Sequence, residues 1–342
     1  MRQVWITKAG SPEVLQVREA PDPTPTDSEV RIRVRAAGIN FADLMARVGL
    51  YPDAPKIPCV VGYEVSGIVD AVGAGVTRVK EGDRVFGMPR FGGYTDTLVV
   101  KEGQAFVMPA AMSFEEAAAL PVVYLTAHHM MLFTGHLRPK SSVLIHSAAG
   151  GVGLAAIELA KTRGCEIFGI ASTSKHDFLR ARGCQHPIAN EADYVAEIRA
   201  LTNGRGVDLI LDPVGGKSWT LGYELLAPAG RLVAFGLSAA GSGKTRSLLH
   251  AVGQVIQIKK WSPMKLMDDN KCVQGVNMGH LFGELPMLQE QFAALVGMYE
   301  AGAIKPYVDR TFKFSEAAEA HHYLHDRKAK GKVLLVPDEL PA

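Results

Sequence analysis

Residues 142–160 constrain the fold of this chain more than any other segment. The segment begins with an aliphatic run, 143–145, continues through small residues that include three glycines, and then places Leu154 and Ile157 at helical spacing. This order predicts a strand, a tight turn and a helix. Because the turn has almost no side chains, another chemical group can approach its backbone closely.

The turn has the pattern Ala148-x-Gly150-x-x-Gly153, the dinucleotide-binding fingerprint with alanine in place of its first glycine. Unpaired N–H groups at the start of the following helix, together with the helix dipole, favour a pyrophosphate there. The alternative is a glycine-rich crossover in an ordinary α/β domain. The residues that we expect to hold the diphosphate are Ala148, Gly150, Gly151, Val152 and Gly153.

The next predicted strand, 166–171, ends in small hydroxyl residues and a lysine. An NAD site usually carries Asp or Glu about 20 residues after the glycines, where the acid binds the ribose 2′-hydroxyl. No acid follows this strand before Asp177, which falls where the next helix has begun. Ser172, Thr173 and Lys175 suit a 2′-phosphate instead, so the sequence predicts NADP(H). The alternative for Lys175 is a solvated residue at a helix start.

Composition and charge exclude several other classes of protein. The 342 residues suffice for two domains, and a net charge of +2 gives no electrostatic case for nucleic acid. Four widely spaced cysteines without a Cys-x-x-Cys motif favour reduced thiols in a cytoplasmic protein. The longest apolar run, 117–133, contains Pro121 and is short for a bilayer, so we expect no transmembrane segment.

The sequence pattern changes near residues 122 and 284. The first 110 residues read as short strands; one of them, 30–35, alternates strictly and so has its apolar side chains on one face. Between 123 and 283, strands and helices alternate as in a doubly wound parallel sheet. The strands expected there are 143–147, 166–171, 186–189, 207–212 and 231–236. The elements expected after 284 are a helix at 288–300, a strand at 307–314, a helix at 315–327 and a strand at 332–336.

Two further patterns are interpreted as unrelated to function. His321, His322 and His325 have the spacing of metal ligands, but the sequence offers no fourth ligand, so we expect them on a solvated helix face. Residues 238–245 nearly match a nucleotide triphosphate loop, but serine replaces its first glycine, and we reject this assignment.

Seven segments resemble the zinc-independent medium-chain dehydrogenases/reductases of the quinone oxidoreductase type, in family order along nearly the whole chain. They are 37–43, 49–52, 62–67, 82–85, 118–121, 147–153 and 331–337. Within that family, 212–216 and 304–306 look closest to the vesicle amine transport protein homologues.

The resemblance implies a fold and an assembly. It implies a GroES-like β-rich catalytic domain, 1–122 and 284–342, around a Rossmann NADP(H)-binding domain, 123–283. The active site would be the cleft between these domains. Homodimers would form through the last Rossmann strand, here within 272–281.

The resemblance also implies roles for three residues of the first domain. Asn40 and Asp43 match positions that line the nicotinamide side of the cleft, although Asn and Asp also cap helices. Tyr51 matches a proton donor of related enoyl reductases, and a phenol suits this role because it is neutral at pH 7. The alternative for Tyr51 is aromatic packing at the cleft mouth.

By the same resemblance, further residues border the cofactor, and two substitutions weaken its binding. Asn190 stands where many relatives have a tyrosine beside the adenine ribose phosphate, and Ala329 replaces an asparagine that often bonds to the cofactor. The residues expected beside the nicotinamide ribose and carboxamide are Phe235, Gly236, Leu237, Val276, Asn277 and Met278.

A catalytic zinc ion is not expected. Such a site needs cysteine, histidine or acidic ligands, whereas Asn40 stands near the first ligand position of the zinc enzymes and Tyr63 replaces the second. The four-cysteine lobe that holds a structural zinc has no counterpart in this sequence.

The predicted activity is NADPH-dependent reduction of quinones or of the C=C bond of α,β-unsaturated carbonyls, with hydride from nicotinamide C4. One alternative is an enoyl-thioester reductase, for which lysines and arginine within 244–271 would bind the coenzyme phosphates. The other is a non-catalytic protein that binds a membrane or a partner and uses NADP(H) as a regulatory ligand.

Overall fold

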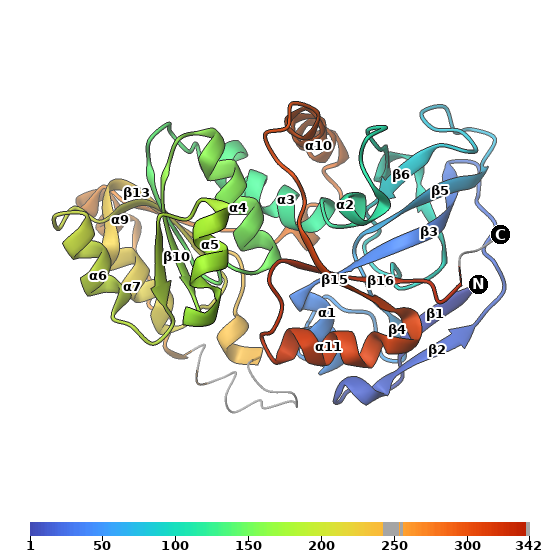
Figure 1. Ribbon diagram of the computed structural model, residues 1–342, viewed down its shortest axis with the longest axis horizontal. Helices are drawn as coiled ribbons and strands as arrows, with labels where there is room; N and C mark the ends of the chain where they lie inside the picture. The colour runs from blue at the N-terminus through green and yellow to red at the C-terminus, as the bar shows by residue number, and fades with distance from the viewer. Residues whose placement is uncertain (242–252, 254–255, 340–342) are drawn as a thin grey trace. The chain divides into compact units, whose positions relative to one another are not determined.

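The computed structural model describes residues 1–241, 253 and 256–339 (Figure 1). Its internal contacts divide the chain into two compact units. The first unit consists of Met1–Leu125 and the C-terminal part from Leu281, and the second takes its described residues from between Thr126 and His280. The sequence pattern predicts these boundaries at 122 and 284. Helix α3 (Pro121–His128) contains the first of the two observed boundaries.

The first unit is built on two sheets. The larger sheet has the order β15 (Val308–Lys313), β16 (Lys332–Val336), β3 (Glu29–Ile39), β5 (Val65–Val72), β6 (Arg84–Gly87) and β8 (Ala105–Val107), and β7 (Thr97–Lys101) also pairs with β3. The smaller sheet has the order β2 (Leu15–Glu19), β1 (Arg2–Ile6) and β4 (Cys59–Val60). The helices are α1 (Phe41–Arg47), α2 (Phe114–Ala118), α10 (Leu285–Glu300) and α11 (Ala317–His325).

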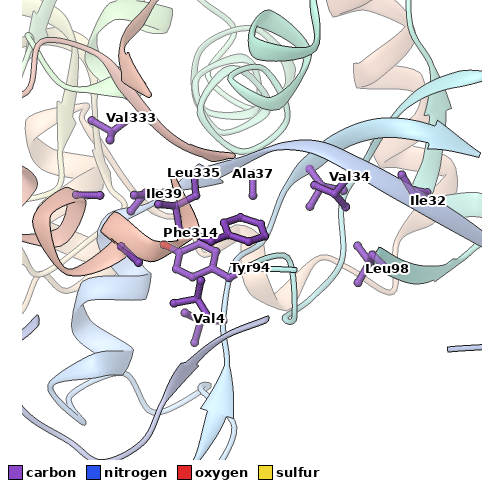
Figure 2. Close-up of a cluster of buried hydrophobic side chains, with 14 of the residues drawn as sticks. Val4, Ile32, Val34, Ala37, Ile39, Tyr94, Leu98, Phe314, Val333 and Leu335 are labelled. Carbon is purple, nitrogen blue, oxygen red and sulfur yellow. The ribbon is translucent and has the colours of Figure 1, made fainter. Parts of the chain in front are cut away.

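Alternation along β3 places the core of the first unit. Val30, Ile32 and Val34 are fully buried, whereas Arg31 and Arg33 between them bond to a carboxylate. Side chains of successive strand residues point to opposite faces, so the strict pattern predicted for 30–35 is confirmed. Figure 2 shows Ile32 and Val34 in a cluster of buried side chains that also includes residues from other strands and Phe314.

The second unit is a six-stranded parallel sheet. Its order is β11 (His186–Ala189), β10 (Glu166–Ala171), β9 (Ser142–Ile145), β12 (Val207–Asp212), β13 (Leu226–Ala234) and β14 (Cys272–Gly275). Its helices are α4 (Gly151–Thr162), α5 (His176–Arg182), α6 (Tyr194–Leu201), α7 (Lys217–Leu225) and α9 (Pro263–Asp269). The chain fills the sheet outward from β9 in one direction and from β12 in the other. The predicted doubly wound sheet is therefore confirmed, with its switch point between β9 and β12.

Most predicted strands agree with the structure to within two residues, and the differences that have a clear structural cause lie in β9 and β13. β9 ends at Ile145 rather than at 147, because the chain turns out of the sheet and Ser147 adopts φ +54°. β13 begins at Leu226 rather than at 231, because it first pairs with Val207 and then shifts register before continuing along β12. A bulge of this kind leaves no signal in hydrophobic periodicity.

The expected solvated face for three C-terminal histidines is wrong for His321. This side chain is fully buried, since the inward stripe of α11 includes Ala317, Ala320 and His321 at helical spacing. Burial lowers the pKa of His321 well below its ordinary value, so the ring is neutral. His322 lies off the stripe and pairs with Glu13 at 2.6 Å.

Two other sequence expectations concern the second unit and membranes. Of the rejected triphosphate loop, Ser238–Gly241 forms a short 3₁₀ turn, and residues 242–245 lie outside the described residues. Among the helices that the structure describes, none combines the length and apolarity needed to cross a bilayer.

Candidate functional site

The strands of a parallel sheet all end at the same edge, and in the second unit this edge gathers the residues predicted to bind a dinucleotide. Register confirms the alignment of neighbouring ends: Ala171 pairs with Ala189, and Ala234 pairs with Gly275. The segments that follow the strands are 148–153 after β9, 172–175 after β10, Asn190 after β11, 235–237 after β13 and 276–278 after β14. Positions far apart in the sequence thus line one edge.

The glycine turn after β9 is possible only because residue 153 has no side chain. A Cβ atom on Gly153 would lie 2.4 Å from the carbonyl oxygen of Ala148, which no real contact of this kind allows. A Cβ on Gly150 would lie 3.2 Å from the Ser147 oxygen. The turn is fastened to β10 by the Ala148 N–H, which donates to the Ile170 oxygen at 3.0 Å. Helix α4 can therefore begin directly against the turn.

This arrangement fits a diphosphate. The first N–H groups of a helix have no acceptor within it, so those of Gly151, Val152 and Gly153 point outward from the start of α4. The twelve residues of α4 add a helix dipole with its positive end at the turn. No acidic side chain lies in the first turn of α4 to repel an anion.

Hydroxyl groups and a lysine lie at the end of the neighbouring strand. Ser172 precedes a 3₁₀ turn, Thr173–Lys175, and its Oγ lies 3.3 Å from that of Ser174. Asn190 is exposed, and its N–H donates to the Ala171 oxygen at 3.1 Å, next to Ser172.

The first acidic residue after β10 belongs to the next helix. Asp177 lies in the first turn of α5 and pairs with Arg180 at 2.9 Å. The expectation that Asp177 already belongs to a helix is confirmed.

The segments after β13 and β14, 235–237 and 276–278, lie close to a tight turn at 213–216. The Phe235 N–H donates to the Asp212 oxygen at 3.1 Å. Gly215 adopts φ +84°, a backbone conformation that favours glycine, and a Cβ atom there would lie 2.2 Å from Leu237 Cδ1. The Val276 N–H donates to the Ala234 oxygen at 2.9 Å, which brings 276–278 beside Phe235. Segments 235–237 and 276–278 are thus neighbours, and Gly236 is exposed.

In the first unit, Asn40 and Asp43 form a capping box at the start of α1. The Asn40 N–H donates to Asp43 Oδ2 at 2.7 Å, and the Gly62 N–H donates to Oδ1 at 3.0 Å. Asp43 is fully buried. The alternative role of this pair, capping a helix, is therefore present in the structure. A contact of either residue with substrate or cofactor stays a prediction.

Burial raises the pKa of Asp43 to about 7. The Asn40 N–H, the positive charge of Lys332 and the Tyr94 hydroxyl all oppose this rise, because they stabilise the carboxylate. Asp43 thus titrates near neutrality while it holds two backbone segments together.

Sequence reasoning missed a buried ion pair beside Asn40. Glu64 Oε1 accepts from Asn40 Nδ2 at 2.8 Å and contacts Lys332 Nζ, which itself donates to Asn40 Oδ1 at 2.7 Å. Glu64 Oε2 accepts from the Val122 N–H at 2.7 Å. Glu64 is fully buried and Lys332 is 3% exposed. The signal available in the sequence was that Glu64 and Lys332 each lie in an otherwise apolar segment, where a charged residue is expected to be paired.

Tyr51 belongs to an aromatic cluster. Its ring lies 6.4 Å from that of Tyr63 at an angle of 89°, and the Tyr63 ring lies 5.1 Å from Phe91. Burial raises the pKa of Tyr51, so the phenol keeps its proton at neutral pH. Tyr51 is half-buried, whereas Tyr63 is 6% exposed.

The cysteines and other metal-ligating residues are dispersed. Cys59, Cys165 and Cys184 are buried, Cys272 is half-buried, and none forms a disulfide. Within the part of the chain that the structure describes, no three His, Cys, Asp or Glu side chains converge as metal ligands would.

Comparisons with known proteins agree with this architecture. Residues 26–112 match the family model described as an alcohol dehydrogenase GroES-like domain, and 182–335 match the one described as a zinc-binding dehydrogenase. The Homo sapiens synaptic vesicle membrane protein VAT-1 homologue is 42% identical over 325 residues, which span 94% of this chain and 82% of that protein.

Two solved structures are also similar. The Escherichia coli quinone oxidoreductase complexed with NADPH has 30% identity and a TM-score of 0.86, over 98% of this chain and 100% of that one. The CurK enoyl reductase has 28% identity and a TM-score of 0.85, over 98% of this chain and 99% of that one. The chain belongs to the medium-chain dehydrogenase/reductase family of oxidoreductases, and the predicted Rossmann-like sheet with a GroES-like domain is confirmed.

Replacing Asp43 by asparagine should remove a pH dependence of stability. A carboxyl whose pKa is about 7 in the folded state and about 3.9 in the unfolded state favours folding when protonated. The unfolding free energy of the wild type, relative to Asp43→Asn, should fall as pH rises from 4 to 7, by at most about 1.4 kcal/mol per pH unit, and level off above. Urea unfolding at several pH values measures this difference. A difference that does not vary with pH would contradict the buried titration.

Proposed function

We propose that this protein is an NADPH-dependent oxidoreductase that reduces quinones or the C=C bond of α,β-unsaturated carbonyls without a metal ion. One observation supports this most: a side-chain-free turn at the start of α4 adjoins a cluster of hydroxyl groups and a lysine that contains no acid. The first feature suits the diphosphate of a dinucleotide, and the second suits a 2′-phosphate rather than a free 2′-hydroxyl.

The residues that would hold the cofactor follow from this edge of the sheet. The N–H groups of 151–153 would bind the diphosphate, and Ser172, Thr173 and Lys175 would bind the 2′-phosphate. Segments 235–237 and 276–278 would border the nicotinamide ribose and carboxamide. Asn190 and Ala329 would contribute less than their counterparts in relatives. When bound, the cofactor supplies a hydride from nicotinamide C4.

Tyr51 would supply the proton that completes the reduction. A neutral phenol can donate a hydrogen bond to a carbonyl oxygen and stabilise negative charge as it develops there. The raised pKa of Tyr51 supports this protonated form. Asn40 and Asp43 would act in the same region, and the contacts of their side chains fix the backbone at the start of α1.

An enoyl-thioester reductase is a second candidate, favoured by the similarity to the CurK enoyl reductase. It would need cationic groups for the coenzyme phosphates. Of the expected lysines and arginine, Lys244 and Arg246 lie outside the described residues, and Lys265 pairs with Asp269 at 2.7 Å. Assays with thioesters beside free enones separate the two substrate classes.

A non-catalytic role at a membrane or partner surface is a third candidate, favoured by the similarity to a vesicle membrane protein. Met264 and Met267 of α9 are 71% and 72% exposed and lie three residues apart, on the same side of the helix. Turnover measured beside liposome co-sedimentation separates this role from catalysis.

We further propose a cytoplasmic homodimer. β14 is the last strand in the order of the second unit's sheet, and its outer edge pairs with no other described strand. An open edge of this kind can continue the sheet into a second copy. Free thiols suit a reducing compartment. Light scattering on the purified protein tests the assembly.

Cofactor selectivity is the first test of the proposed function. Lys175→Ala should raise the Kd for NADPH by roughly tenfold and leave the Kd for NADH unchanged, because only the 2′-phosphate would use this charge. Isothermal titration calorimetry measures both constants. Lys140→Ala, which removes an exposed charge before the start of β9, is the control and should change neither. Equal affinity of the wild type for NADH and NADPH would refute the selectivity.

Proton donation by Tyr51 is the second test. Tyr51→Phe should lower kcat about a hundredfold with a quinone or enone, while the Kd for NADPH stays the same. Tyr63→Phe is the matched control, because it removes a neighbouring hydroxyl from the same aromatic cluster. If both variants keep the wild-type rate, Tyr51 only packs, and water supplies the proton.

A further inference from the structure

A buried imidazole and a buried carboxylate face each other at the switch point of the parallel sheet. His146 is the first residue after β9, and Asp212 is the last residue of β12. Their side chains are 5% and 0% exposed. The proposed function uses neither of them, although the switch point is where doubly wound sheets bind their ligands.

Asp212 organises the turn that follows it. Its Oδ1 accepts from the N–H groups of Val214 and Gly215 at 2.6 and 3.2 Å. Its Oδ2 accepts from Ser218 Oγ at 2.5 Å, in the first turn of α7. Three donors thus fix the path of 213–216 around one carboxylate.

His146 is held beside this carboxylate without bonding to it. Its backbone N–H donates to the Leu211 carbonyl oxygen at 3.0 Å, and its ring Nε2 lies 3.7 Å from Asp212 Oδ2. That distance exceeds a hydrogen bond, and among the described residues Nε2 has no other partner. The Tyr194 ring packs perpendicular to the imidazole at 5.3 Å.

The two residues are linked to both halves of the predicted cofactor site. His146 is followed directly by the glycine turn, whose Ala148 and Gly153 are in steric contact. On the other side, the Ser238 N–H donates to the Pro213 oxygen at 2.8 Å, which ties 235–237 to the turn that Asp212 organises.

We propose that His146 and Asp212 are positioning residues for dinucleotide binding. Across the switch point, they set the spacing between the glycine turn after β9 and the turn at 213–216, so that backbone groups of both segments meet the cofactor together. The inference rests on the proposed function. Neither side chain need touch the cofactor, since each acts through the turn beside it.

The same two strands supply a matched control at their opposite ends. Asp208 Oδ2 accepts from the N–H and the Oγ of Ser142, at 2.9 and 3.0 Å. This carboxylate also joins β12 to β9 and is 12% exposed, but it lies at the edge away from the cofactor segments. If both carboxylates served stability alone, replacing either one would leave the Kd for NADPH unchanged wherever the variant is folded.

The experiment compares cofactor affinity with thermal stability in four variants. Asp212→Asn and His146→Phe should raise the Kd for NADPH about tenfold, since the first removes the charge and one acceptor oxygen that fix the turn at 213–216, and the second removes the imidazole that faces them. His146→Gln keeps a polar group near Nε2 and should restore most of the affinity. Asp208→Asn should lower the melting temperature but leave the Kd within about twofold. Calorimetry gives the Kd at a temperature where circular dichroism shows each variant to be folded.

Hydrogen exchange on the cofactor-free protein provides a second readout. Amides of 147–153 and 213–216 should exchange faster in Asp212→Asn and His146→Phe than in Asp208→Asn. Unchanged affinity in Asp212→Asn, or an equal loss in Asp208→Asn, would overturn the inference while leaving the proposed function intact. Failure of the wild type to bind NADPH would overturn both.

Discussion

The absence of one side chain allows α4 to start where it does. Any Cβ on Gly153 would collide with the carbonyl oxygen of Ala148, so only glycine lets the helix begin against the turn that leaves β9. Its N–H groups then face outward at the edge where every strand of the parallel sheet ends. The hydroxyl groups after β10, the turn after β12 and the segments after β13 and β14 matter for binding because they share that edge. Dinucleotide binding by these segments would therefore depend on the close approach of Gly153 to the Ala148 carbonyl oxygen, which a residue with a side chain could not keep.

Two buried charged sites, one in each unit, are paired to different extents. In the first, Glu64 and Lys332 neutralise each other, and the Asn40 amide bonds to both, so each of these three side chains has a polar partner. In the second, three donors surround Asp212, but the nearby His146 imidazole has a nitrogen with no hydrogen-bond partner in the part of the chain that the structure describes. A satisfied network fixes one arrangement. An incomplete one in a buried site is more easily explained by a functional demand than by stability.

Most of the fold could be predicted from local sequence patterns. Contacts between residues far apart in the sequence could not. Alternation in β3 and the glycine turn before α4 follow from neighbouring residues, and both agree with the structure. The shift of β13 depends on pairing with Val207 in another strand. The burial of His321 depends on which face of α11 packs against the core. The polar residues beside His321 in the sequence made that face hard to recognise. The pairing of Glu64 with Lys332 joins positions 268 residues apart, which no local pattern can show.

The position of β16 has a consequence for how the chain is made. This strand lies between β15 and β3, one strand in from the edge of the larger sheet, and it brings Lys332 to Glu64. During synthesis on the ribosome, residues 1–125 therefore emerge long before the strand that completes their sheet. The strands and helices of the second unit come from one continuous stretch and can assemble first. The carboxylate of Glu64 therefore stays hydrated until Lys332 has been translated.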